Sequence, residues 1–319
     1  MLKWASLAVF ALVVIAVLST LWMVEKRRSI AKNDFPPPGR FVDVDGHPVH
    51  YVERGNLAAP AVVLIHGASG NTRDFTFDLV DRLSDRYRVI IFDRPGLGHT
   101  PPLAAKGVTI EQQATLLARA TAEIGAKNPI VAGQSFGGAI TMAWAVHRPD
   151  TLAAAVSIAG ATYPWEGKLN TFYARLANPW TGPVISRLIS AWASETYVAE
   201  TMNSIFAPQP APKGYDAYIG VPLILRPATL MANAQQRHDL RPQLNALYPR
   251  YKDLTIPVEI IHGDADTTVG LHVHSTRMVE DITDANLVVL KGVGHMPHHT
   301  NPEDVVAAID RAAARAGLH

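Results

Sequence analysis

The fold is decided by one stretch of the sequence, residues 129–138, which reads PIVAGQSFGG. Its first part, Pro129–Ala132, is a short continuous apolar run, as expected for a strand buried on both faces. The residues after the turn, Phe136–Val146, are apolar nearly all round, which predicts a buried helix. Between them lies Gly133-Gln134-Ser135-Phe136-Gly137, which matches G-x-S-x-G in the strand–turn–helix setting that this motif requires.

Ser135 is predicted to be a nucleophile because of this setting. The turn between such a strand and helix is sharp and strained, so the flanking positions must be small. It lifts the serine hydroxyl out at the head of the sheet, beside a helix N-terminus where negative charge is favoured. The alternative is a glycine-rich turn with an incidental serine.

Apolar runs of the same kind recur on both sides of this stretch and alternate with segments that favour helices. Thr109–Gln112 has the pattern of a capping box, and Asn301-Pro302 is typical of a helix start. Buried strands that alternate with helices predict an α/β fold with a mostly parallel central sheet flanked by helices. The runs are Ala61–Ile65, Val89–Phe92, Leu152–Ala159, Val258–Ile261 and Leu287–Leu290.

An insertion interrupts this alternation. Residues 161–250 contain no buried-strand run and are rich in aromatic side chains and prolines, which favours a mostly helical cap. The core is then expected to comprise residues 40–160 and 251–319. It begins with a hairpin that turns at Asp45-Gly46.

The N-terminus predicts a membrane anchor over residues 1–24. Trp4–Val24 is long and apolar enough to cross a bilayer, and tryptophans lie near both of its ends. A cleaved signal peptide is the alternative, but no small-x-small site follows the run. The basic residues after the run favour a cytoplasmic catalytic domain, whereas Lys3 favours the opposite orientation, so the side of the membrane stays open. Residues 25–39 are expected to form a linker, stiffened by Pro36-Pro37-Pro38.

The composition excludes several classes of partner and chemistry. The 29 basic and 28 acidic side chains nearly balance, and no useful basic run lies outside residues 26–32, so nucleic acid is not an expected partner. The chain has no cysteine, which excludes disulfides, a cysteine nucleophile and thiolate metal sites.

A base and an acid for Ser135 are predicted after the last two strands. His295 follows Gly292-Val293-Gly294, a small stretch that lets its loop approach the serine. Asp264 and Asp266 both follow Val258–Ile261, and either could orient the histidine. Serine, acid and histidine then come in the chain order expected when this triad lies at the ends of successive strands.

Two further predictions concern the loops around the serine. The backbone N–H groups of Ala68 and Phe136 are candidates for an oxyanion hole. His66 and Asp93 are expected to brace loops by hydrogen bonds. A metal at His295, His298 and His299 is not expected, since no carboxylate lies at a matching spacing, and no cofactor is predicted.

Over residues 40–317 the chain resembles the α/β-hydrolase superfamily of serine hydrolases. The motifs that carry the resemblance are His66-Gly67, Asp93–Gly98, Gly133–Gly138, Gly263–Asp266 and Gly294-His295. The family's acid stands three residues after the glycine of its G-x-x-D motif, which implies Asp266 and leaves Asp264 as a loop residue. The resemblance also implies a cap at residues 161–250. Ser135 departs from the aspartate that haloalkane dehalogenases and epoxide hydrolases carry at this turn, so those activities are not expected.

The expected activity is hydrolysis of a small, apolar acyl substrate such as a carboxylic ester, through an acyl-enzyme at Ser135. Two alternatives stay open. One is a carbon–carbon bond hydrolase with the same triad, and the other is a catalytically silent hydrolase fold that serves as a binding protein.

Overall fold

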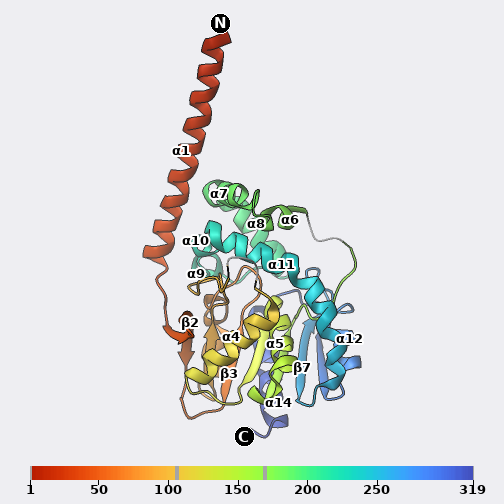
Figure 1. Ribbon diagram of the computed structural model, residues 1–319. Helices are drawn as coiled ribbons and strands as arrows, with labels where there is room; N and C mark the ends of the chain where they lie inside the picture. The colour runs from red at the N-terminus through yellow and green to blue at the C-terminus, as the bar shows by residue number, and fades with distance from the viewer. Residues whose placement is uncertain (1, 105–107, 168–170, 319) are drawn as a thin grey trace.

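The computed structural model describes residues 2–104, 108–167 and 171–318, and the centre of this described part is an eight-stranded sheet (Figure 1). The strand order is β1-β2-β4-β3-β5-β6-β7-β8. β2 pairs antiparallel with β1 and β4, and every other pairing is parallel. The strands are β1 (Arg40–Val44), β2 (His47–Arg54), β3 (Ala61–Ile65), β4 (Arg88–Phe92), β5 (Ile130–Gln134), β6 (Ala154–Ile158), β7 (Val258–Gly263) and β8 (Ala285–Leu290).

Helices cover both faces of this sheet, which explains why its strands are continuous apolar runs. α4 (Ile110–Glu123) and α5 (Phe136–His147) pack on one face, and α3 (Leu79–Leu83) and α14 (Pro302–Arg315) pack on the other. Alternate residues of one strand enter the two cores: Val131 belongs to the first, and Ile130 and Ala132 to the second. The predicted α/β fold, with a mostly parallel central sheet flanked by helices, is confirmed.

The chain between β6 and β7 forms a set of helices that lies above the carboxyl ends of the parallel strands (Figure 1). This arrangement places the helices, α6 to α11 and here called the cap, over the edge of the sheet where the turn after β5 emerges. They are α6 (Thr171–Ala177), α7 (Gly182–Trp192), α8 (Glu195–Phe206), α9 (Tyr215–Tyr218), α10 (Val221–Ile224) and α11 (Pro227–Leu247). The remaining helices are α2 (Arg73–Thr76), α12 (Ser275–Asp281) and α13 (Pro297–Thr300), with 3-10 turns at Pro149–Thr151 and Tyr248–Asp253.

The N-terminal helix α1 (Leu2–Asp34) projects away from this body (Figure 1). It is long and apolar enough to cross a membrane, and its most apolar part is not buried against the rest of the protein. Residues 25–34 of the expected linker continue the helix. This stretch contains good helix formers, and extending an existing helix needs no new nucleus. The helix ends just before Pro36, because a proline disfavours helical backbone in the residue before it.

Candidate active site

The turn after β5 holds Ser135 in a strained conformation. Its φ is 54° and its ψ is −116°, a backbone geometry that residues other than glycine rarely adopt. The flanking glycines are required by close contacts: a Cβ at Gly133 would lie 2.2 Å from the carbonyl oxygen of Gly137, and one at Gly137 would lie 2.0 Å from that of Ile65. The turn can therefore form only with glycine at these two positions.

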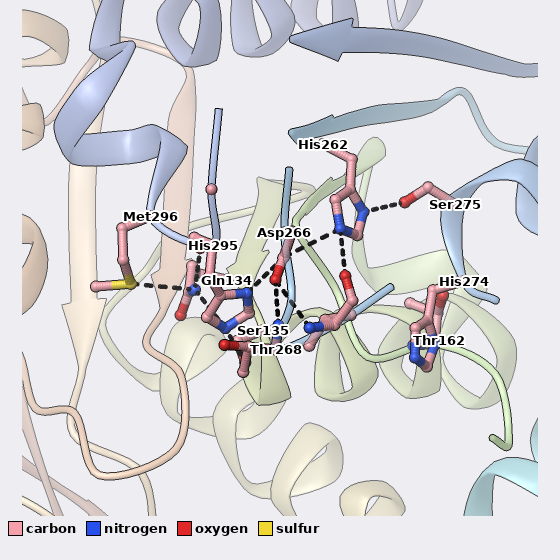
Figure 2. Close-up of polar contacts among 12 residues, drawn as sticks. Gln134, Ser135, Thr162, His262, Asp266, Thr268, His274, Ser275, His295 and Met296 are labelled. Atoms are coloured by element: carbon pink, nitrogen blue, oxygen red, sulfur yellow. Dashed lines mark hydrogen bonds and ion pairs between the residues drawn. The ribbon is translucent and has the colours of Figure 1, made fainter. Parts of the chain in front are cut away.

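Three predicted side chains from separate parts of the chain meet at this turn (Figure 2). Nε2 of His295 lies 3.0 Å from Oγ of Ser135, and Nδ1 of His295 lies 2.7 Å from Oδ2 of Asp266. All three residues are buried. With the Nδ1–H tautomer of His295, the imidazole donates to the carboxylate and accepts from the serine hydroxyl. This is the arrangement in which a histidine can take the serine proton.

The carboxylate of Asp266 is held by four donors. Oδ1 accepts from the backbone N–H groups of Thr268 (2.8 Å) and Val269 (2.9 Å), while Oδ2 accepts from His295 and from Nε2 of His262 (3.1 Å). Burial by itself would raise the pKa of Asp266, but the hydrogen bonds from His262 and His295 outweigh it and hold the pKa well below its ordinary value. Asp266 is therefore a fixed negative charge beside the His295 ring.

Asp264, the other acid considered, lies elsewhere. Its Oδ1 accepts from the backbone N–H of Gly292 at 2.6 Å, in an exposed part of the neighbouring loop. Asp264 thus orders the loop that precedes His295 and makes no hydrogen bond to that ring.

The two candidate oxyanion donors line the same cavity as Ser135. Phe136 is the first residue of α5, and Ala68 lies in the loop after β3. Within the described part of the chain, neither backbone N–H donates a hydrogen bond. Both groups are therefore available to an oxygen that becomes negative beside Ser135.

His66 and Asp93 brace the loops around the site, as expected. Nδ1 of His66 lies 2.9 Å from the carbonyl oxygen of Gly67, and Nε2 of the same ring accepts from the backbone N–H of Arg94 at 3.1 Å. The carboxylate of Asp93 accepts from the N–H groups of Thr72 and His99 and from His50. Neither side chain contacts Ser135 or His295.

Sequence reasoning missed two residues that support these groups. Asn233 of α11 accepts from the N–H of Ser69 at 2.8 Å and donates to its Oγ at 3.0 Å, so the cap secures the loop that carries Ala68. Gln134 donates to the backbone carbonyl of His295 at 3.1 Å. Gln134 stands at a variable position of G-x-S-x-G, and Asn233 has no local motif, so no signal in the sequence distinguished either one.

His298 and His299 form a separate cluster with Asp74. Their Nε2 atoms lie 3.3 Å and 2.9 Å from the carboxylate oxygens, and Tyr215 donates to the same carboxylate at 2.6 Å. The ligand atoms of Asp74, His298 and His299 all lie within 4.8 Å of one another, so among the described residues these three could together hold a metal ion. The carboxylate comes from a part of the chain that sequence spacing did not suggest. In this arrangement the carboxylate of Asp74 is hydrogen-bonded to Tyr215, His298 and His299.

A cavity of about 710 Å³ extends from Ser135 and His295 into the cap. A volume of this size matches a medium-sized organic ligand. Arg237 of α11 also lines it, stacked over the ring of Tyr173 at 4.1 Å. Its walls are mainly apolar side chains of the cap helices, among them Leu176, Ile189, Val198, Met202, Ile205 and Leu230.

Known proteins with similar sequences or structures include several hydrolases. The chain is 28% identical over 273 residues to 2-(acetamidomethylene)succinate hydrolase from Mesorhizobium japonicum. This match covers 85% of this chain and 93% of that protein. It is 39% identical over 111 residues to the dihydrolipoyllysine-residue acetyltransferase component of the acetoin cleaving system from Cupriavidus necator, a match that spans only 29% of that protein.

A solved structure of a membrane phospholipase A, described as a bacterial virulence factor, is similar in fold. Its TM-score is 0.65 at 20% identity, and the match covers 98% of this chain and 99% of that one. The sequence profile of the alpha/beta hydrolase family matches residues 62–309, which include Ser135, Asp266 and His295. On this match, and on the sheet and helices already described, the chain belongs to the alpha/beta hydrolase family.

Proposed function

We propose that this protein is a membrane-anchored serine hydrolase that cleaves carboxylic esters of apolar, lipid-like acyl groups. The single observation that carries the proposal is the unbroken series of hydrogen bonds from Asp266 through His295 to Ser135 at the base of the cavity. The apolar walls of this cavity favour an acyl chain. The likeness to a solved membrane phospholipase A over the whole chain, α1 included, supports a lipid substrate and an anchor.

The reaction follows from the geometry of the proposed triad. His295 accepts the proton of Ser135 while the serine oxygen attacks the ester carbonyl, and Asp266 stabilises the imidazolium that forms. The N–H groups of Ala68 and Phe136 donate to the carbonyl oxygen as it becomes negative. His295 then gives the proton to the departing alcohol. Water attacks the acyl-enzyme in the same way, which releases the acid and restores Ser135.

The test combines a fluorophosphonate probe with a panel of substrates. The probe should label the peptide that contains Ser135, and Ser135→Ala should lose both labelling and ester hydrolysis while it unfolds at the same temperature as the wild type. Ester turnover should rise from short to long acyl chains and exceed turnover of vinylogous 1,5-diketones. Labelling at another residue would overturn the triad. Full labelling with preference for the diketones would instead support a carbon–carbon bond hydrolase, and no labelling would support a silent binding protein.

A further inference from the structure

One face of α7 presents large apolar side chains to the solvent. Trp180, just before the helix, and Val184, Leu188 and Trp192 within it follow one another at four-residue spacing, which aligns them along one side. Their exposed fractions are 85%, 59%, 47% and 56%. An apolar stripe of this kind, here called the α7 stripe, is typical of a surface that contacts a membrane or another protein.

The α7 stripe is not part of the wall of the substrate cavity. Ile189 of the same helix lines that cavity, and Ser186 and Ser190 are buried against the body of the protein. The four stripe residues do not line the cavity. One side of α7 therefore serves the cap and its cavity, and the α7 stripe faces away from that cavity.

The α7 stripe lies beside the N-terminal helix. The indole N–H of Trp192 donates to Oγ1 of Thr20 at 3.1 Å, and Arg27 donates to the carbonyl oxygen of Ala193 at 3.4 Å. Figure 1 shows α7 next to α1, while the N-terminal part of α1 continues past it. The cap thus contacts α1 within its apolar run, which ends at Val24, as well as after it.

The length of α1 determines how close the cap comes to the membrane. Residues 3–18 are all exposed, and the first partly buried residue of α1 in this region is Ser19. At about 1.5 Å per residue, residues 3–18 span about 24 Å, which is shorter than the hydrocarbon core of about 30 Å. The missing length is supplied by the next residues of α1, Ser19 to Val24, among them Thr20, which is hydrogen-bonded to Trp192 of α7. A bilayer that accommodates α1 must therefore reach the level of α7.

The charges near this contact suit a lipid surface. Lys26 lies 5.6 Å from the ring of Trp22 just beyond the apolar run, and Arg187 of α7 is exposed beside Val184 and Leu188. Tryptophan is favoured at the boundary between hydrocarbon and headgroups, and basic side chains there attract anionic phosphates. Along α1, the apolar residues that suit the hydrocarbon core are thus followed by the basic residues that suit the lipid headgroups.

We propose that the α7 stripe inserts into the interfacial region of the same bilayer that α1 crosses, so that the cap rests on the lipid surface. This inference rests on the proposed membrane anchor and goes beyond it, because it assigns a second membrane contact to the catalytic domain. α6, α7 and α8, whose inner sides line the cavity, then lie at the membrane. An acyl chain can pass from the leaflet into the cavity without crossing bulk water.

The absence of cysteine from the chain makes a direct test possible. Val184→Cys and Leu188→Cys each create a single site for an environment-sensitive fluorophore in the full-length protein. Leu57→Cys is the matched control, since Leu57 is an exposed apolar residue in the loop between β2 and β3. The proteins are reconstituted into vesicles of phosphatidylcholine and phosphatidylglycerol. Labels at 184 and 188 should be quenched by nitroxide-bearing lipids and shielded from iodide, whereas the label at 57 should show the reverse.

Two results would overturn the proposal. Iodide quenching at 184 and 188 equal to that at 57 would place the stripe in water. Shielding from both quenchers, with energy transfer between labelled copies, would show that a second copy of the chain covers it. Sedimentation of the Leu57→Cys protein with the vesicles tests the anchor separately, so failure of the anchor and failure of the stripe are distinguishable.

An activity measurement adds a second, independent readout. The double variant Val184→Asp/Leu188→Asp should hydrolyse an ester in vesicles at least about tenfold more slowly than the wild type, because charge is disfavoured in the apolar boundary of a bilayer. Its rate on a short, water-soluble ester should stay within about twofold, since neither residue lines the cavity. Equal losses on both substrates would contradict a role in membrane docking.

Discussion

His262 donates to the same oxygen of Asp266 that accepts from His295. Nε2 of His262 lies 3.1 Å from Oδ2 of Asp266, and Nδ1 of the same ring lies 2.6 Å from Oγ of Ser275 (Figure 2). The hydroxyl of Ser275 can donate to Nδ1, which leaves the proton on Nε2, where it faces the carboxylate and the carbonyl oxygen of Val269. A second, buried imidazole thereby orients the proposed catalytic acid.

Asp266→Asn is expected to reduce turnover by about 10⁴, because an amide in place of the carboxylate can hold His295 in the wrong tautomer. Asp264→Asn is the matched control and should retain most of the activity, since the side chain of Asp264 accepts from the backbone N–H of Gly292 and not from His295. Steady-state ester hydrolysis by the two purified variants measures the difference. A larger loss from Asp264→Asn would show that the wrong acid was chosen.

His262→Gln should reduce kcat about tenfold with little change in KM, by analogy with the hydrogen bonds that orient metal-binding side chains, whose loss typically costs about 10–100-fold. Its loss removes one of the hydrogen bonds that hold the carboxylate of Asp266 in place beside His295. Steady-state ester hydrolysis by the purified variant separates the change in kcat from the change in KM. An unchanged kcat would mean that His262 serves only to pack the core.

Asn233→Leu should also reduce kcat, by about tenfold, because it releases Ser69 and with it the loop that carries the Ala68 N–H. Direct removal of an oxyanion donor typically costs about 10²–10³ in rate, and an indirect displacement costs less. Gln235→Leu, on the same helix, is the control and should have no effect. If both variants behave alike, the link between cap and loop does not influence the reaction.

The free energy of unfolding should fall as the pH drops from about 6.5 to about 4. Burial lowers the pKa of His66 to about 4, assisted by the charge of Arg94, and burial likewise lowers the pKa of His298 to about 4. The unfolded chain, with histidine pKa values near 6.5, therefore binds more protons over this range than the folded chain does. The contribution of these two neutral histidines to the free energy of unfolding is fully present above about pH 6.5. Each of the two lowered pKa values corresponds to at most about 3 kcal/mol of that free energy.

Denaturant titrations at pH 7.5 and 4.5 measure this loss. His66→Gln should reduce it, because glutamine can keep one donor and one acceptor for Gly67 and Arg94 but does not titrate. His272→Gln, at an exposed position, should leave it unchanged. An equal acid sensitivity in all three proteins would exclude His66 as a source.

Local sequence patterns were sufficient to predict the turn that carries Ser135 and the start of the helix after Thr109. The strand–turn–helix at residues 129–146 follows from apolar runs and from glycines that no other residue could replace. The capping box at Thr109 and Gln112 is also present in the structure. The helical conformation of residues 25–34 was not anticipated, because the prolines that stop the helix lie only after residue 35.

By itself, the sequence determined the α/β-hydrolase fold, the place of Ser135 on its turn, and an apolar helix at the N-terminus. Each of these depends on residues close together in the chain, whose periodicity and steric limits can be read directly. Only the tertiary structure decided that Asn233 holds the loop after β3, that His262 shares Asp266 with His295, and that Trp192 meets Thr20. The Asn233 and Trp192 contacts join segments more than 160 residues apart, and all three contacts depend on how packed elements orient individual side chains. No local pattern encodes that orientation.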